Sequence, residues 1–240
     1  IFIYSEITKE ILDKLPRLKA IMTMSTGYDH INISECKKRN ILVYNVPYYG
    51  ENTVAEHTFA LILALSRRIV DSAERTKLDN FKLDGLRGFD LKGKILGVIG
   101  PGHIGQHVIR MANGFEMKII AYSPNTDKKL AKKLNFKYAK LEDLLKNSDI
   151  ITIHCPLNEK TENMINMGNV KIIKKGAYLI NTARGKIVDT KALIYALDKK
   201  ILAGAGLDVL EGECDIKEEK QLLHKKFSEK CNWQTLIANH

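Results

Sequence analysis

The chain has 240 residues, enough for one or two domains with hydrophobic cores. Its hydrophobic content of 45% and charged content of 28% are ordinary for a soluble globular protein, and no apolar run approaches the ~20 residues of a membrane-spanning helix. The net charge of +10 would suit a nucleic-acid partner, but the lysines are dispersed and no nucleic-acid motif accompanies them, so we expect neither nucleic-acid nor membrane binding.

The first 78 residues alternate short apolar segments with amphipathic ones. Residues 18–24 and 41–46 predict strands, with a helix at about 32–39 between them. Residues 51–78 predict one long helix, because apolar residues recur near helical spacing and Asn52 is a suitable N-cap. A polar, glycine-containing stretch follows at 79–93, and we place a linker there. Residues 1–78 are therefore expected to form a first domain that ends in a linking helix.

The rest of the chain, 94–240, repeats strand and helix signals. Apolar runs predict strands at 94–100, 117–122, 149–154, 177–181 and 201–208, with a weaker one at 136–138. Helical segments lie between them at 103–114, 127–134, 141–147 and 189–199. Buried strands rich in Ile and Val that alternate with helices predict a parallel sheet covered on both faces, which is a doubly wound α/β domain.

A glycine motif follows the first strand of this second domain. Gly100, Gly102 and Gly105 form G-x-G-x-x-G between a predicted strand and a predicted helix. The first glycine allows a tight turn, the second lets backbone approach a pyrophosphate, and the third allows close packing of helix on strand. The helix N-terminus stabilises the phosphate charge. The motif in this context predicts a dinucleotide cofactor.

The end of the next strand bears on which dinucleotide binds. An NAD site usually has Asp or Glu there for the adenosine ribose, whereas this chain has Ser123. Serine can hydrogen-bond a hydroxyl but does not repel a 2′-phosphate, and Lys128 and Lys129 follow closely. We expect NAD, with NADP as the alternative.

Other chemically distinctive residues follow the later strands. His154–Pro156, Asn181–Gly185 and Asp208 all lie at predicted carboxyl ends, where ligands bind in open α/β sheets. Arg184 could hold a carboxylate or carbonyl oxygen by paired hydrogen bonds. One of the acids in LDVLEGE could raise the pKa of an imidazole so that it donates a proton, while Glu211 is expected to be a solvated acid.

The four cysteines are scattered through the chain without a CxxC pair. This pattern argues against a zinc site and against a disulfide scaffold. We therefore expect no metal and a cytoplasmic location.

Five motifs follow one another in the chain: VPYYGENTVAEHTFALILALSRR, DLKGKILGVIGPGHIG, HCPLNEKTENMIN, LINTARGKIVD and AGAGLDVLEGE. From about residue 18 onward the sequence resembles the D-isomer-specific 2-hydroxyacid dehydrogenases, with the closest likeness to the D-lactate dehydrogenase branch. The resemblance implies a Rossmann-type NAD-binding domain and a flavodoxin-like α/β substrate domain whose first strand and helix would precede Ile1. It also implies a homodimer that reduces a small 2-oxo acid with NADH.

The resemblance assigns a role to individual residues. Arg184 would bind the 2-oxo acid, and Glu213 would orient and charge a catalytic histidine. The cofactor would contact the glycine motif together with His103, Ile104, Ser123, Cys155, Pro156, Thr161, Thr182, Ala183, Arg184 and Asp208. In the first domain, the substrate would contact the backbone N–H groups of Thr26 and Gly27 and the hydroxyl of Tyr49.

The chain departs from the family in its histidine. The family histidine normally follows Thr-Pro, but no Pro-His pair occurs here and the sequence ends on QTLIANH. We expect His240 not to be the acid/base, so that the chain binds dinucleotide better than it turns over. The rival hypotheses are an NAD-sensing, corepressor-like protein of the same fold and a relative acting on phosphoglycerate, glyoxylate or formate.

Overall fold

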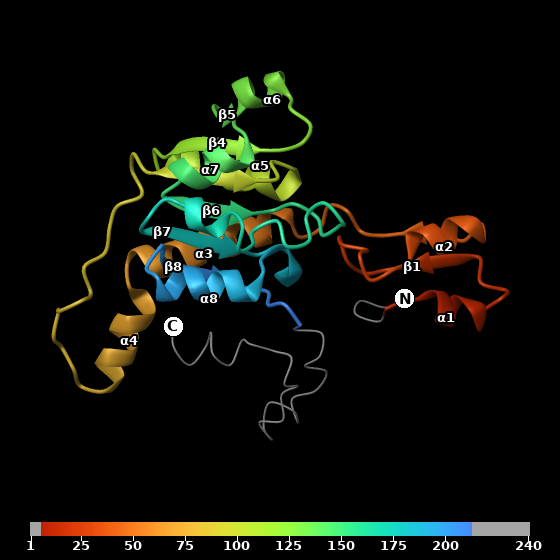
Figure 1. Ribbon diagram of the computed structural model, residues 1–240, viewed down its shortest axis with the longest axis horizontal. Coiled ribbons are helices and arrows are strands. Elements are labelled where there is room, and N and C mark those ends of the chain that lie inside the picture. The colour runs from red at the N-terminus through yellow and green to blue at the C-terminus, as the bar shows by residue number, and fades with distance from the viewer. Residues whose placement is uncertain (1–5, 213–240) are drawn as a thin grey trace. The chain divides into compact units, whose positions relative to one another are not determined.

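The computed structural model describes residues 6–212 (Figure 1). The chain divides into two compact units, Ile1–Glu51 and Asn52–His240. Among the described residues, no helix is both long enough and apolar enough to cross a membrane.

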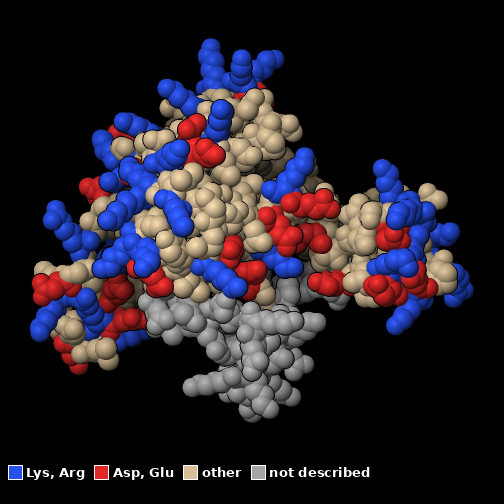
Figure 2. Space-filling view, viewed as in Figure 1, with Lys and Arg blue, Asp and Glu red and all other residues tan. Residues whose placement is uncertain are grey.

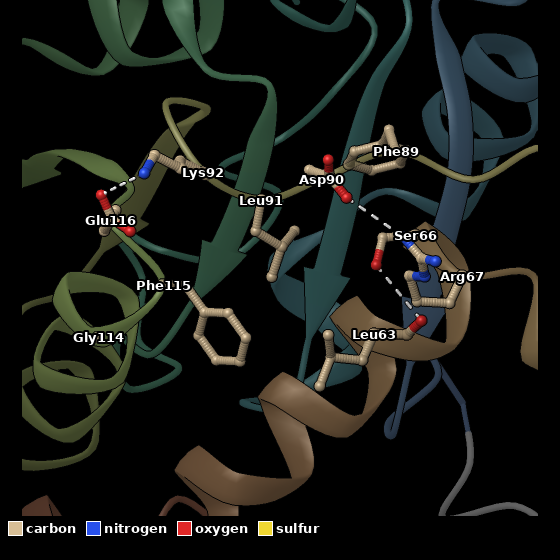
Figure 3. Close-up of a pocket in the computed structure, with 10 residues that line it drawn as sticks. All are labelled: Leu63, Ser66, Arg67, Phe89, Asp90, Leu91, Lys92, Gly114, Phe115 and Glu116. Carbon is tan, nitrogen blue, oxygen red and sulfur yellow. Dashed lines mark hydrogen bonds and ion pairs between the residues drawn. The ribbon is translucent and has the colours of Figure 1, made fainter.

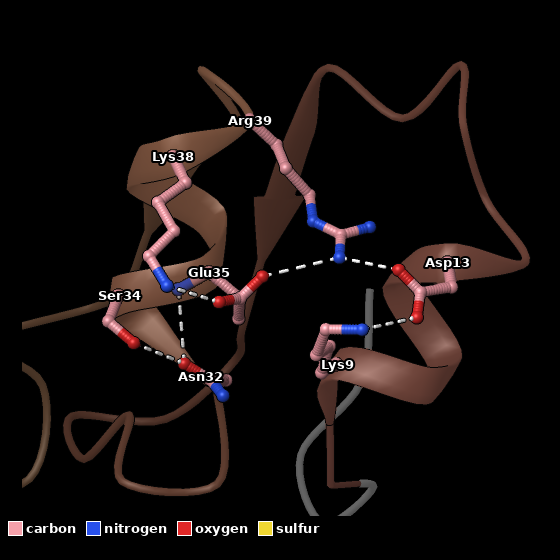
Figure 4. Close-up of polar contacts among 7 residues, drawn as sticks. All are labelled: Lys9, Asp13, Asn32, Ser34, Glu35, Lys38 and Arg39. Carbon is pink, nitrogen blue, oxygen red and sulfur yellow. Dashed lines mark hydrogen bonds and ion pairs between the residues drawn. The ribbon is translucent and has the colours of Figure 1, made fainter.

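The first unit is a small α/β layer around a two-stranded sheet. Its parallel strands, β1 (Ala20–Met22) and β2 (Leu42–Tyr44), are joined through α2 (Ile33–Lys38), and α1 (Lys9–Asp13) precedes them. The core is made of buried side chains from α1, β1, α2 and the segments that connect the elements: Leu12, Ile21, Ile31, Cys36 and Ile41. Arg39 ties α1 to α2, because its guanidinium lies 2.6 Å from Asp13 and 3.3 Å from Glu35 (Figure 4). Exposed ion pairs of this kind contribute at most about 1 kcal/mol, so the apolar core holds the unit together.

The second unit is built on a six-stranded, fully parallel sheet. Its strands are β3 (Ile95–Ile99), β4 (Lys118–Tyr122), β5 (Lys137–Tyr138), β6 (Ile150–Ile153), β7 (Ala177–Asn181) and β8 (Leu202–Leu207). Their order in the sheet is β5-β4-β3-β6-β7-β8. The chain therefore adds β4 and β5 on one side of β3 and then crosses over to add β6, β7 and β8 on the other side. This confirms the doubly wound architecture expected from the sequence.

Helices cover both faces of this sheet (Figure 1). One face packs against α3 (Glu51–Ser66) and α5 (His103–Gly114), whose buried residues share a core with β3 and β4. The other face packs against α7 (Leu141–Asn147) and α8 (Thr190–Asp198), with β6 and β7 in that core. A short helix, α6 (Lys128–Lys133), follows β4. All four residues of β6 are buried, which explains why isoleucines occur on both faces of this strand rather than on one.

The long helix expected at 51–78 is two helices. The structure has α3 at Glu51–Ser66 and α4 at Ile69–Lys77, separated at Arg68, whose φ of 53° is left-handed. The expected N-cap was also wrong: the helix begins at Glu51, and the Asn52 amide donates to Glu56 within the helix. A left-handed residue inside a helix interrupts the backbone ladder, and the apolar spacing did not reveal it.

The division into units differs from the expected linker at 79–93. The contact boundary falls at Glu51, and α3 belongs to the second unit because Ala55, Phe59 and Ile62 are buried in the core of the six-stranded sheet. The amphipathic pattern identified a buried helix but did not say which sheet buries it.

Candidate functional site

All strands of the six-stranded sheet are parallel, so their carboxyl ends lie at one edge. That edge gathers the loop 100–105 after β3, Ser123 after β4, His154–Pro156 after β6, the loop 181–185 after β7, and Asp208 after β8. Residues far apart in the sequence are therefore brought to one side of the sheet, as expected from the sequence.

The glycine loop has the geometry that its sequence predicts. Gly100 has a φ of 90°, and a Cβ there would lie 2.7 Å from the backbone nitrogen of Cys155. A Cβ on Gly105 would lie 2.3 Å from the carbonyl oxygen of Gly100, so α5 can approach β3 this closely only with glycine. Gly102 caps α5, which begins at His103, and a Cβ on it would meet no atom within 4 Å. The open backbone at the helix N-terminus fits a pyrophosphate.

Ser123 comes directly after β4 and is half-buried. Its Oγ accepts a hydrogen bond from the Asn125 backbone N–H at 3.3 Å. Asp127 caps α6 by accepting from the backbone N–H groups of Lys129 and Leu130. The only carboxylate of this loop thus serves a helix, while the side chains of Lys128 and Lys129 are exposed.

His154 follows β6 with a buried imidazole. Its Nε2 lies 2.8 Å from the Thr152 hydroxyl, and its Nδ1 is buried without a hydrogen-bond partner among the described residues. Burial lowers the pKa of His154 to about 3, because the charged imidazolium would lose its hydration. Burial also raises the pKa of the adjacent Cys155 thiol to about 11. Neither side chain is therefore charged near neutral pH, so the HCP segment adds no charge to the carboxyl edge of the sheet.

Thr161 holds the loop after His154 together. Its buried hydroxyl donates to the Pro156 carbonyl at 2.6 Å and accepts from the Asn158 N–H at 2.8 Å. This hydrogen-bonded turn directly follows Cys155, whose backbone lies against Gly100 of the glycine loop.

The loop carrying Arg184 is organised by Asn181, which sequence analysis placed at the end of a strand but to which it gave no role of its own. The buried Asn181 side chain accepts from the Ala183 N–H at 3.0 Å and donates to the Arg184 carbonyl at 2.9 Å. Its backbone carbonyl accepts from the Asp208 N–H at 3.0 Å. Asn181 thus links the end of β7 to the end of β8. The signal available in the sequence was an Asn placed to hydrogen-bond backbone two residues on.

Gly185 allows the loops that follow β7 and β8 to pack closely against each other. A Cβ there would lie 2.1 Å from the carbonyl carbon of Leu210, so only glycine allows the two backbones to touch. Beside this contact, Glu211 accepts from the backbone N–H and the hydroxyl of Thr190 at 3.2 and 2.7 Å. The expectation that Glu211 is a solvated acid was therefore wrong: it stabilises the first turn of α8.

Helix α3 reaches the same edge through two adjacent residues. The Thr58 hydroxyl lies 3.0 Å from the Thr182 hydroxyl, and His57 Nε2 lies 3.3 Å from Asp208 Oδ1. Sequence analysis did not single out either helix residue, because nothing in a helical pattern shows which loop the helix will meet.

The expected substrate residues of the first unit lie after its two strands. Thr26 and Gly27 follow β1, with the Thr26 hydroxyl donating to the Val46 carbonyl at 3.1 Å. The Gly27 carbonyl accepts from the Ser25 hydroxyl at 2.6 Å. Tyr49 follows β2 and is exposed. Glu213 and His240, the other two residues considered for catalysis, lie outside the described residues.

A pocket of about 410 Å³ lies elsewhere in the second unit (Figure 3). It forms where the chain enters β3 and β4, so it lies at the amino ends of the strands rather than at the carboxyl edge. Its apolar lining comes from Leu63, Phe89, Leu91 and Phe115, and two ion pairs, Arg67–Asp90 and Lys92–Glu116, lie at it.

On the molecular face shown in Figure 2, acidic side chains are interspersed among the basic ones. The described residues contain no cluster of His, Cys, Asp or Glu arranged to hold a metal ion.

Comparison with known proteins gives the family. The model for the NAD binding domain of D-isomer specific 2-hydroxyacid dehydrogenases matches residues 59–228. A 2-hydroxyacid dehydrogenase homolog of Zymomonas mobilis is 41% identical over 218 residues, which are 89% of this chain and 65% of that protein. A glyoxylate reductase of Thermococcus litoralis is 42% identical over 221 residues, 89% of this chain and 67% of that protein.

The structural comparison agrees with the sequence comparison. The crystal structure of D-lactate dehydrogenase from Aquifex aeolicus, complexed with NAD and lactic acid, superposes with a TM-score of 0.90 at 42% identity, covering 98% of this chain and 70% of that one. The chain therefore belongs to the D-isomer-specific 2-hydroxyacid dehydrogenase family, which confirms the resemblance inferred from its motifs. It spans about two thirds of the length of the curated relatives it matches.

Proposed function

We propose that this protein is an NAD-dependent oxidoreductase that interconverts a 2-oxo acid and a D-2-hydroxy acid, with pyruvate and D-lactate as its substrate pair. The observation that carries the proposal is the placement of two loops at one edge of the sheet: the open glycine loop, which fits a dinucleotide, and the loop of Arg184, which can bind a carboxylate. The pyruvate and D-lactate assignment is supported by the likeness to a D-lactate dehydrogenase, while glyoxylate is the competing substrate because several relatives are glyoxylate reductases.

In the proposed reaction, bound NADH supplies the hydride for C2 of the 2-oxo acid. Arg184 would hold the acid by paired hydrogen bonds, and its loop is kept in place by Asn181 and Gly185. The uncharged His154 and Cys155 would line the cofactor path without introducing charge. Asp208 would lie near the nicotinamide. Glu213 would orient the histidine that protonates the substrate oxygen.

The remaining substrate contacts would come from the first unit. The backbone N–H groups of Thr26 and Gly27 would bind the substrate carboxylate, and the Tyr49 hydroxyl would add a further hydrogen bond. In support, all three residues follow the carboxyl ends of parallel strands, where loops are free to bind ligands.

We favour NAD over NADP. The pyrophosphate would bind at Gly102, His103 and Ile104, and the adenosine ribose at Ser123. The NAD-binding domain of the family and the NAD complex of a relative support this choice. Lys128 and Lys129 are the features that would favour NADP. Cys155, Pro156, Thr161, Thr182 and Ala183 would line the path from adenine to nicotinamide.

The protein would act as a homodimer in the cytoplasm. Helix α4 has no buried residue, and the segment after it exposes large apolar side chains, with Leu78, Phe81 and Leu83 each more than 70% exposed. Apolar side chains grouped in this way are typical of an interface, and a second copy of the chain would cover them.

Scattered free cysteines such as Cys36 suit a reducing compartment, which supports the proposed cytoplasmic location.

Turnover by the whole protein tests the proposal. NADH and NADPH consumption would be measured with pyruvate, glyoxylate, hydroxypyruvate and longer 2-oxo acids, and the chirality of the product would be determined. We expect NADH oxidation with pyruvate and a D-product. Dinucleotide binding without turnover on any of these acids would instead support the corepressor-like alternative.

A further inference from the structure

Helix α3 packs directly on β8, the strand that Asp208 follows. Strand β8 reads LAGAGL, and its two glycines face the helix. A Cβ on Gly206 would lie 3.1 Å from Leu61 Cβ, and a Cβ on Gly204 would lie 3.4 Å from a methyl carbon of Leu65. The small residues therefore let α3 lie directly on β8, which brings its side chains within reach of the loops at the carboxyl edge.

The first of these side chains is Thr58, which is fully buried. Its hydroxyl donates to the Val54 carbonyl one turn earlier at 2.8 Å, which uses its single proton. In the 3.0 Å contact between the two hydroxyls, Thr182 must therefore be the donor and Thr58 the acceptor. Thr182 is itself only 7% exposed, so the rotamer of this residue, two before Arg184, is fixed by the helix.

The second side chain is the neighbouring His57. Its Nε2 lies 3.3 Å from Asp208 Oδ1, and each side chain is 48% exposed. Asp208 is tied through its backbone N–H to Asn181, so its main chain is already fixed. The contact with His57 adds a restraint on the carboxylate itself.

We propose that Thr58 and His57 are positioning residues, through which α3 sets the loop of Thr182 and Arg184 and the carboxylate of Asp208 for dinucleotide binding. The inference rests on the proposed function, because it assigns the two loops to the cofactor site. Neither helix residue is required to touch the cofactor. Their effect is to exclude alternative rotamers of Thr182 and Asp208, so that less conformational entropy is lost when the cofactor binds.

The test measures the NADH dissociation constant and the urea unfolding curve of the same variants. His57→Ala should weaken NADH binding about two- to fivefold, the range expected for a half-exposed polar contact. His57→Gln, which keeps a polar side chain facing the carboxylate, should restore part of this loss. In the Asp208→Ala background, His57→Ala should have no further effect on the dissociation constant.

Thr58→Val has a matched control in Thr53→Val, the same substitution at an exposed position of the same helix. Thr58→Val should weaken NADH binding at least about fivefold, because the Thr182 hydroxyl loses its acceptor in a buried place. Thr53→Val should leave the dissociation constant unchanged.

The outcomes separate this inference from the proposed function. Wild-type NADH binding together with unchanged dissociation constants in His57→Ala and Thr58→Val would overturn the inference alone, even if both variants unfold more easily. Additive effects of His57→Ala and Asp208→Ala would overturn the role of the pair. A wild-type protein that binds neither NADH nor NADPH would overturn the proposed function and this inference together.

Discussion

His154, at the carboxyl edge of the six-stranded sheet, has a pKa far below that of an ordinary histidine. A histidine next to a glycine loop suggests a proton carrier, but this imidazole is buried and its pKa is lowered to about 3. It therefore stays neutral through the physiological pH range. Its contact with Thr152 indicates that it supports the loop after β6 instead.

The buried imidazole should make stability depend on pH. The pKa of His154 is about 3 in the folded chain against 6.5 for the unperturbed group, so below pH 6.5 the unfolded state binds a proton that the folded state does not. The stability contributed by the neutral imidazole is present above pH 6.5 and is lost progressively as the pH falls toward about 3. Between about pH 7.5 and about pH 5, this linkage should cost about 2 kcal/mol.

Urea unfolding of the wild type and of His154→Asn at these two pH values checks this prediction. The wild type should lose about 2 kcal/mol more than the variant on acidification. Equal losses in the two proteins would show that His154 is protonated to the same extent in the folded and unfolded states.

Ser123 is the residue that bears most directly on cofactor choice. Ser123→Asp should leave NADH affinity unchanged or increase it, because a carboxylate can accept hydrogen bonds from the ribose hydroxyls. The same change should weaken NADPH binding at least about fivefold, since like unit charges about 4 Å apart repel by about 1 kcal/mol even in water. Titration of both dinucleotides into both proteins measures the difference. An undiminished NADPH affinity in the variant would show that Ser123 does not face the ribose.

At the scale of elements, the strands and helices of the second unit could be predicted closely, but local interruptions could not. The expected helices at 103–114 and 141–147 match α5 and α7, because their apolar spacing records burial against the sheet. The break at Arg68 and the role of Glu211 were missed for a common reason. Both depend on one backbone angle or one tertiary partner, and neither changes the periodicity of the sequence.

The packing of α5 on β3 gives a prediction at this scale. Gly105→Ala should destabilise the fold by about 1–3 kcal/mol, because the new Cβ would meet the Gly100 carbonyl oxygen at 2.3 Å and backbone cannot move aside cheaply. Gly114→Ala, in the same helix, is the matched control: its Cβ would meet nothing within 4 Å, so it should stabilise by about 0.5–1 kcal/mol. Thermal unfolding of both variants measures the two effects, and equal melting temperatures would contradict the packing described.

For the whole molecule, the sequence was sufficient to predict a doubly wound sheet and the residues that follow the carboxyl ends of its strands. The strand ends that carry Gly100, Ser123 and Arg184 can be located because parallel strands place all their carboxyl ends together. The unit boundary could not be predicted, since α3 is amphipathic whichever sheet covers it. The link that Asn181 makes between the ends of β7 and β8 could not be predicted either, because it depends on these two strands being neighbours in the sheet.

The proposed homodimer is tested at the same scale. Replacing Phe81 and Leu83 together by serine should convert a dimer to a monomer, because both side chains are more than 70% exposed in the single chain. Met167→Ser is a control at an exposed apolar position of another loop. Light scattering after size-exclusion chromatography gives the mass. A dimer that survives the double substitution would place the interface elsewhere, and a monomeric wild type would refute the proposed dimer.

The proposed function requires that the carboxyl edge of the six-stranded sheet bind a nicotinamide dinucleotide through the glycine loop. The most direct measurement is calorimetric titration of NADH into the wild type and Gly102→Val. The structure allows the variant to fold, because Gly102 has a φ of −76° and open space around it. We predict saturable binding to the wild type, and its loss in Gly102→Val at an unchanged melting temperature. Absence of binding to the wild type, or equal affinity in the two proteins, would show that the glycine loop does not hold the dinucleotide.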